Sequence, residues 1–295
     1  MRRALSLPSV PRIETLFSPQ RRHRATAALA ALLVQLLALP ASADSRYGDE
    51  TLPESVQAQL RQLLPQRPGS VDIYALVVGG DADDEVFRRE TAAVRNALDA
   101  RLGTVGRSVV LVNHRSQPAP EATFNSVRQV LHALARRMDP NEDVLWLHLT
   151  SHGAPDHALV LSYPNRKLHW LTASHLRKML DEAGIRYRVV VVSACYSGGF
   201  VPPLAGPETL VATSSAASRK AYGCGNASQM TDFSRALYLK ALPQTRSVPE
   251  AVRLPLQIIH QQEAADHVEH SYPQMRSGAA IETRLKELPL PRTGR

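Results

Sequence analysis

The chain has 295 residues, of which 44% are hydrophobic and 21% are charged, and its mean hydropathy is −0.21. This size and balance allow a buried core and argue against a disordered chain and against a polytopic membrane protein. Of the formal net charge of +8, the first 43 residues contribute +5, from six arginines and one glutamate. The remaining +3 is not concentrated in a basic run, so we do not expect nucleic acid as a partner.

The first 43 residues have the three parts of a secretory signal peptide. A basic stretch over 21–24 precedes an apolar stretch over 25–39, which is followed by Pro40 and the small-residue triplet 41–43. The apolar stretch is shorter than the roughly 20 residues that a membrane-spanning helix needs. We therefore predict a signal peptide over 1–43, a periplasmic or secreted mature chain, and no stable membrane insertion after cleavage. A retained membrane anchor is the alternative.

The mature chain holds only two cysteines, Cys195 and Cys224. Two cysteines are too few for a fold that is built on disulfides, so the hydrophobic core must supply the stability. In an oxidising compartment the two could still pair with each other. The residues alone leave that alternative open.

From residue 71 to 285 we predict a single domain, preceded by a lead-in helix and linker over 44–70 and followed by a tail over 286–295. Within the domain, short apolar runs alternate with amphipathic segments, which is typical of parallel strands joined by crossover helices. The near-continuous hydrophobicity of the runs indicates strands that are covered on both faces. The expected strands are Ile73 to Val78, Ser108 to Val112, Val144 to Thr150, Arg188 to Ser193 and Thr209 to Thr213.

Apolar residues at helical spacing fill the first three gaps between these strands, so each of these three gaps is expected to hold a helix. Gly103 is a stop signal for the first helix, and Thr172 is a candidate N-cap for the third. After the fifth strand, Ser247 and Glu250 form a capping-box pair that opens a long helix, which Pro255 is expected to kink. The expected helices cover about 87–102, 124–138, 173–183, 233–239 and the residues from 248 onward.

Two side chains with catalytic chemistry follow the third and fourth expected strands. His152 and Gly153 come directly after the third strand, and Cys195 comes after the fourth. Ligands of open parallel sheets bind beyond the carboxyl ends of the strands, and neighbouring strands lie about 4.8 Å apart, so we expect both side chains in one crevice. An imidazole beside a thiol can stabilise the thiolate and protonate a leaving amine, which favours acyl transfer. The backbone N–H groups of Gly153 and Cys195 are candidate oxyanion donors.

Other interpretations of these residues stay open at this point. A cysteine after an apolar strand is often a small core residue, and a single histidine is often a solvated one. A disulfide between Cys195 and Cys224 would block the nucleophile.

The segments around the two residues resemble the histidine and cysteine motifs of legumain-like cysteine peptidases, the family of asparaginyl endopeptidases and of the catalytic subunit of the GPI transamidase. Residues 150–153 read Thr-Ser-His-Gly, and residues 194–199 read Ala-Cys-Tyr-Ser-Gly-Gly. The resemblance covers about 71–281 and is nearest to the bacterial branch of the family. The segments that carry the similarity to the bacterial branch are 86–90, 138–140, 222–224 and 273–274.

The resemblance implies an α/β fold, a caspase-like three-layer sandwich with a mostly parallel six-stranded central sheet. It also implies a cysteine endopeptidase that acts on peptide or protein substrates through an acyl-enzyme thioester, by hydrolysis or transamidation, without a cofactor. By position, His152 is the general base and acid, Cys195 is the nucleophile, and Gly153 is the oxyanion donor together with Cys195.

The specificity pocket matches the family less well. Legumains that cleave after asparagine line this pocket with an arginine near the first strand and with acidic groups after the cysteine and in the late helix. Here the first loop is acidic over 81–85, and the late helix has Arg235 one turn after its acid. If Arg235 neutralises Asp232, the first-loop acids dominate the electrostatic field of the pocket. We then expect a preference for asparagine or a basic residue over aspartate at the cleavage site. The candidate substrate-binding residues are Glu85, Ser151, Tyr196, Ser214 and Asp232.

Two functions from other classes stay open. One is a catalytically silent caspase-fold binding module, and the other is a thiol hydrolase of non-peptide acyl substrates. We expect no metal site: His260, Glu263, His267 and His270 share a helical face, which we interpret as a solvated polar face. The sequence does not specify an oligomeric state.

Overall fold

The structure is a computed structural model that describes residues 51–164, 166–167, 170–288 and 290. The predicted signal peptide lies outside the described residues and stays a prediction. These described residues form one compact unit. Among the helices of the described ranges, none combines the length and the apolar character that crossing a bilayer requires.

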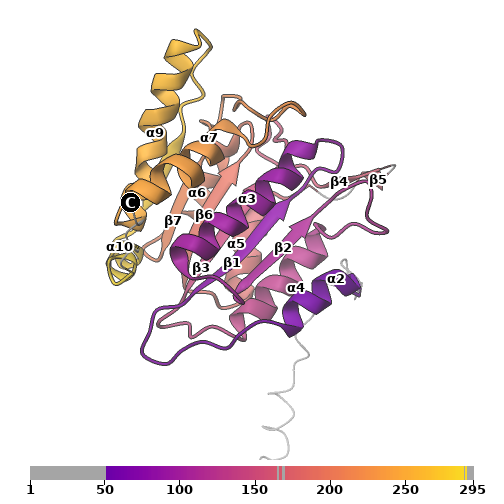
Figure 1. The fold of residues 1–295 in the computed structure, drawn as a ribbon, viewed down its shortest axis with the longest axis vertical. Coiled ribbons are helices and arrows are strands. Elements are labelled where there is room, and N and C mark those ends of the chain that lie inside the picture. The colour runs from indigo at the N-terminus through magenta and orange to yellow at the C-terminus, as the bar shows by residue number, and fades with distance from the viewer. Residues whose placement is uncertain (1–50, 165, 168–169, 289, 291–295) are drawn as a thin grey trace, which may run out of the picture. The chain divides into compact units, whose positions relative to one another are not determined.

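A six-stranded sheet runs through this unit in the order β2-β1-β3-β6-β7-β8 (Figure 1). The first five of these strands are parallel to one another, and the edge strand β8 is antiparallel to β7. The mostly parallel six-stranded architecture that the family resemblance implied is thus confirmed. The strands are β1 (Ile73–Gly79), β2 (Ser108–Val112), β3 (Val144–Thr150), β6 (Tyr187–Ser193), β7 (Thr209–Thr213) and β8 (Gln274–Ser277).

Helices cover both faces of the sheet, which gives three layers. Side chains alternate along a strand, and Ala75, Val77 and Trp146 point into a core that is shared with the helices α3 and α9. Their neighbours in the strands point to the opposite face, where α4 and α5 pack (Figure 1). The longer helices are α3 (Glu85–Leu102), α4 (Phe124–Ala135), α5 (Ala173–Glu182), α9 (Val248–Ala265) and α10 (Ala279–Lys286).

The predicted helix boundaries are set by the expected caps. Gly103 ends α3 in the left-handed conformation with φ of 65°, and the Thr172 hydroxyl accepts a hydrogen bond from the His175 N–H at the start of α5. The segment expected as a helix over 233–239 is a short helix α7 (Asp232–Ser234) that continues into a π-helical segment η3 (Arg235–Ala241). The remaining elements are α2 (Glu54–Arg61), β4 (Ser162–Tyr163), β5 (Arg166–Lys167), η2 (Ser197–Phe200), α6 (Val201–Leu204) and α8 (Leu242–Gln244).

The lead-in helix α2 covers one edge of the sheet. The side-chain amide of Gln59 accepts a hydrogen bond from the Val110 N–H at 2.8 Å and donates one to the Val110 carbonyl at 3.0 Å. Gln59 therefore satisfies backbone groups of β2 that would otherwise be free to pair with another chain.

Candidate active site

The register of the central strands brings the predicted histidine and cysteine loops together. Thr150 at the end of β3 pairs with Ser193 at the end of β6, and His152 and Cys195 each lie two residues further on. The loops stay in contact beyond the strands, because a Cβ atom on Gly153 would lie 2.0 Å from the Cys195 carbonyl oxygen. Only glycine permits this approach.

The backbone on either side of Cys195 is held by side chains from two other loops. The Ser214 hydroxyl accepts a hydrogen bond from the Ala194 N–H and donates one to the Ala194 carbonyl, both at 2.9 Å. On the other side, the His157 ring donates from Nδ1 to the Tyr196 carbonyl at 3.2 Å. Tyr196 itself has a left-handed φ of 57°. These bonds fix the turn that presents the thiol.

The Cys195 thiol is half-buried and bonded to the backbone of Ala221. The thiol donates to the Ala221 carbonyl at 3.7 Å, and the Ala221 N–H points at the sulfur at 3.4 Å. Burial raises the pKa of the Cys195 thiol, and the Ala221 N–H opposes this rise. At neutral pH Cys195 is therefore mainly a thiol.

His152 is held by a carboxylate that the sequence analysis did not assign to it. The ring Nε2 lies 2.7 Å from Oδ2 of Asp84, and the Phe87 ring packs edge-on against the imidazole at 5.1 Å between centroids. A hydrogen bond with Cys224 is the largest cause of a rise in the pKa of His152 to about 9; burial opposes this rise, and Asp84 and Asp81 add to it. His152 is therefore an imidazolium at neutral pH.

The second cysteine lies in this site as a free thiol. Neither cysteine forms a disulfide, and Cys224 raises the pKa of both His152 and Cys195. The loop that carries Cys224 is fastened to the start of α3, because Asn226 accepts a hydrogen bond from the Glu85 N–H at 2.8 Å. Arg89 donates to the Asn226 carbonyl at 2.6 Å.

Three of the candidate substrate-binding residues have their polar groups engaged within the protein. Ser214 holds the backbone before the nucleophile, and the buried Ser151 hydroxyl donates to the Val160 carbonyl at 2.7 Å. The Glu85 carboxylate is paired with Arg88 and with His114. For these three residues a direct contact with substrate stays a prediction.

The acidic groups near the site are also paired. The predicted pair between Asp232 and Arg235 is present, and burial raises the pKa of Asp232 although Arg235 opposes it. Asp83 lies 3.4 Å from Arg115. Asp81 is buried, and its carboxylate accepts hydrogen bonds from two backbone N–H groups and from the Ser162 hydroxyl.

Potential metal ligands in the described ranges cluster once, where one ligand atom each from Asp81, Asp84 and His152 lie within 4.8 Å of one another. The hydrogen bonds of Asp81 and the ion pair between Asp84 and His152 already engage these three side chains.

The prediction that His260, Glu263, His267 and His270 share one helical face was wrong, because α9 ends at Ala265 and the residues after it turn back. There His270 stacks on His260, and Glu263 is buried against Ser271.

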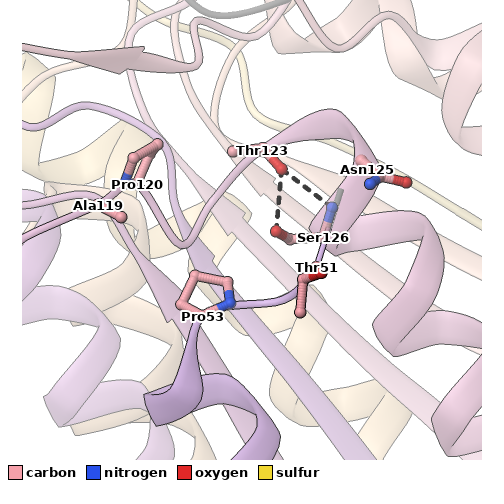
Figure 2. A pocket seen from close by; sticks show the side chains of 7 residues that line it. All are labelled: Thr51, Pro53, Ala119, Pro120, Thr123, Asn125 and Ser126. Carbon is pink, nitrogen blue, oxygen red and sulfur yellow. Dashed lines mark hydrogen bonds between the residues drawn. The ribbon is translucent and has the colours of Figure 1, made fainter. Parts of the chain in front are cut away.

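A hollow of about 140 Å³ lies beside the start of α4 (Figure 2). Two of its polar side chains bond each other, since the Thr123 and Ser126 hydroxyl oxygens lie 2.9 Å apart. No cysteine or histidine lines it, so it does not offer the chemistry of the other site. The lining residues are Thr51, Pro53, Ala119, Pro120, Thr123, Asn125 and Ser126.

A comparison with protein families matches the part of the chain that contains this site. Residues 136–277, which include both His152 and Cys195, match the model of the Peptidase C13 family. This region is a Peptidase C13 region. The legumain-like resemblance is therefore confirmed, and the family is one of cysteine peptidases. The similarity to its bacterial branch stays a prediction.

One solved structure shows a more distant likeness. The chain is similar to the crystal structure of caspase-1 from Spodoptera frugiperda, with a TM-score of 0.48 and 14% sequence identity. The alignment covers 72% of this chain and 92% of that one. A search of curated proteins gave no match.

Proposed function

We propose that this chain, whose residues 136–277 match the Peptidase C13 family, is a cysteine endopeptidase in which Cys195 is the nucleophile and His152 is the general acid and base. The observation that carries the proposal is the meeting of the two loops beyond β3 and β6, inside the region that matches the family. Periplasmic or secreted action on peptide or protein substrates is part of the same proposal.

In the acylation step the Cys195 thiol first loses its proton to the solvent, and the resulting thiolate attacks the carbonyl carbon of the substrate amide. A C–S bond forms, and the π electron pair moves to the carbonyl oxygen. When the intermediate collapses, the C–N bond breaks and the His152 imidazolium gives its proton to the leaving amine. The products are a free amine, a thioester on Cys195 and a neutral imidazole.

In the second step, neutral His152 accepts a proton from water while the water oxygen attacks the thioester carbon. The C–S bond then breaks, which releases a carboxylic acid and regenerates the thiolate and the imidazolium. If an amine attacks in place of water, the same sequence gives transamidation, because only the incoming nucleophile differs.

The Gly153 N–H is the proposed donor to the oxyanion. In the bridge between Gly153 and Leu159, the backbone bonds are made by the His152 carbonyl and the Ala154 N–H. The Gly153 N–H takes no part in that bridge. Together with the Cys195 N–H it would donate to the developing negative charge, the kind of interaction that is worth about 10²-fold in rate or more.

A peptidase assay with matched cysteine variants tests the proposal. The wild type should cleave peptides from a positional library, Cys195→Ala should show no cleavage above background, and the Cys224→Ala control should retain measurable turnover. Cleavage that survives Cys195→Ala would overturn the proposal. Absence of cleavage by the wild type, together with no reactive thiol, would favour a silent binding module. Hydrolysis of thioesters but not peptides would favour the non-peptide hydrolase.

In the same assay, a series of peptides that differ only before the scissile bond should be cleaved faster with asparagine or lysine than with aspartate. The physical reason is the negative charge of Asp81, which is held by hydrogen bonds from neutral groups, whereas Asp83, Asp84 and Glu85 are paired with Arg115, His152 and Arg88. Fastest cleavage of the aspartate peptide would contradict this preference.

We expect an alkaline pH optimum. Burial raises the pKa of Cys195, so the thiolate fraction increases as the pH rises above neutral. The pKa of His152 is about 9, so the proton for the leaving amine is lost only above that pH. The value of kcat/KM, measured from about pH 6 to about pH 10, should therefore rise beyond neutrality and then fall. An optimum below neutral pH would contradict this assignment of the two groups.

A further inference from the structure

Asp84 occupies the N-cap position of α3, but its side chain does not cap the helix. An aspartate at this position ordinarily accepts a hydrogen bond from a backbone N–H in the first turn. In α3 no such side-chain bond is present, although the Asp84 backbone carbonyl still accepts one from the Phe87 N–H at 3.3 Å. The carboxylate instead lies 2.7 Å from Nε2 of His152.

Other groups hold the start of α3 and thus make the carboxylate dispensable there. The Glu85 N–H donates to the Asn226 side chain at 2.8 Å, and Arg89 donates to the Ser228 carbonyl at 2.7 Å. The Asp84 N–H donates to Asp81 at 3.1 Å, which fixes the backbone. The direction of the Asp84 side chain therefore serves His152 rather than the helix.

A carboxylate at one ring nitrogen has two effects on an imidazole. It fixes the ring plane and places a proton on Nε2, so proton exchange with substrate is left to Nδ1. It also stabilises the positive charge of the ring. Both effects are needed by a histidine that protonates a leaving amine.

We propose that Asp84 is a positioning residue that orients His152 and stabilises its imidazolium form, which extends the site to Cys195, His152 and Asp84. This inference rests on the proposed peptidase function. The ionisable groups that face His152 are Asp84 and Asp81 from the loop after β1 and Cys224 from the loop after β7. Asp81 is tied by its own hydrogen bonds, so Asp84 is the carboxylate that can be removed with least disturbance.

The first experiment measures His152 directly, without turnover. In a Cys195→Ala background, an NMR titration should show a lower pKa for His152 in Asp84→Asn. The matched control is Asp83→Asn, whose exposed carboxylate pairs with Arg115 and does not touch His152; it should leave the titration unchanged. If the pKa of His152 is the same in Asp84→Asn and in Asp83→Asn, the inference is overturned.

The second experiment follows kcat/KM against pH. The kcat/KM of Asp84→Asn should be about 10²-fold below that of the wild type, mainly through a lower kcat. The alkaline limb of its pH profile should move to lower pH. Asp84→Glu should recover part of the loss, whereas Asp84→Ser, which can still cap a helix, should not. Recovery of full activity by Asp84→Ser would show a purely structural role and overturn the inference.

The two experiments fail in different ways. If the His152 titration shifts in Asp84→Asn but the wild type cleaves no peptide, the proposed function is wrong while the role of Asp84 toward His152 stands. If the wild type is active and neither the titration nor the pH profile moves, the peptidase assignment stands and the role of Asp84 is wrong.

Discussion

Cys195→Ala and His152→Ala should each nearly abolish peptide cleavage, and the double variant should be no worse than Cys195→Ala alone. The His152 substitution should cost about 10² to 10⁴-fold in kcat/KM, because the leaving amine loses its proton donor. The Cys195 substitution removes the atom that forms the thioester, so no acylation remains for His152 to assist. Residues that act as a unit are non-additive in this way.

Measuring kcat/KM for the wild type, the two single variants and the double variant checks this expectation. Circular dichroism and thermal unfolding of the four proteins serve as the control for folding. If the losses of the single variants instead multiply in the double variant, the two residues act independently, and the assignment of one shared reaction step is wrong.

The framework of the fold could be predicted because its signals are local. Each parallel strand is a near-continuous apolar run, and the predicted ranges agree with the observed ones to within one residue at each end. The edge strand β8 has the sequence Gln-Met-Arg-Ser, which has no apolar run. It becomes a strand because it pairs with β7, and pairing partners cannot be inferred from its own residues.

The site could be predicted only in part, for the same physical reason. His152 and Cys195 follow apolar strands, so the sheet topology suffices to bring their loops together. Asp84 and Cys224 reach His152 through helix and loop packing over 68 and 72 positions of the chain, respectively. A local signal for Asp84 does exist, since an aspartate before a helix is an N-cap candidate, but that signal predicts capping rather than contact with His152.

A buried polar network lies beneath the site and links it to the core. Glu90 and His148 are fully buried, and His148 Nε2 lies 3.0 Å from Glu90 Oε1. The Glu90 carboxylate also accepts hydrogen bonds from the Ser234 hydroxyl at 2.7 Å and from the Thr231 N–H at 2.8 Å. Burial alone would raise the pKa of Glu90, but these bonds and His148 outweigh it, so the pKa is lowered. Glu90 is therefore an ion in the folded protein.

Glu90→Ala should destabilise the protein by about 1 to 3 kcal/mol, the typical cost of leaving buried hydrogen-bonding groups without a partner. The loss leaves His148 and the Thr231 N–H without their partner in a site closed to water. Glu90→Gln should cost less, because the amide oxygen can still accept a hydrogen bond. Urea denaturation of the three proteins gives the free energies of unfolding, and a cost below about 1 kcal/mol for Glu90→Ala would contradict the role of these hydrogen bonds in stability.

Glu90→Ala should also lower peptidase activity, because the hydrogen-bond network reaches the end of β6, which precedes the nucleophile. Thr231, whose N–H binds Glu90, shares a hydrogen bond at 2.8 Å with the Ser193 hydroxyl, two residues before Cys195.

The folded-state pKa of Glu90 is lowered, so the contribution of Glu90 to stability is present above the ordinary pKa of a glutamate. This contribution is lost as the pH falls through the lowered value. The wild type should therefore lose stability in acid more steeply than Glu90→Gln. Equal slopes of unfolding free energy against pH would show that Glu90 is not charged in the folded protein.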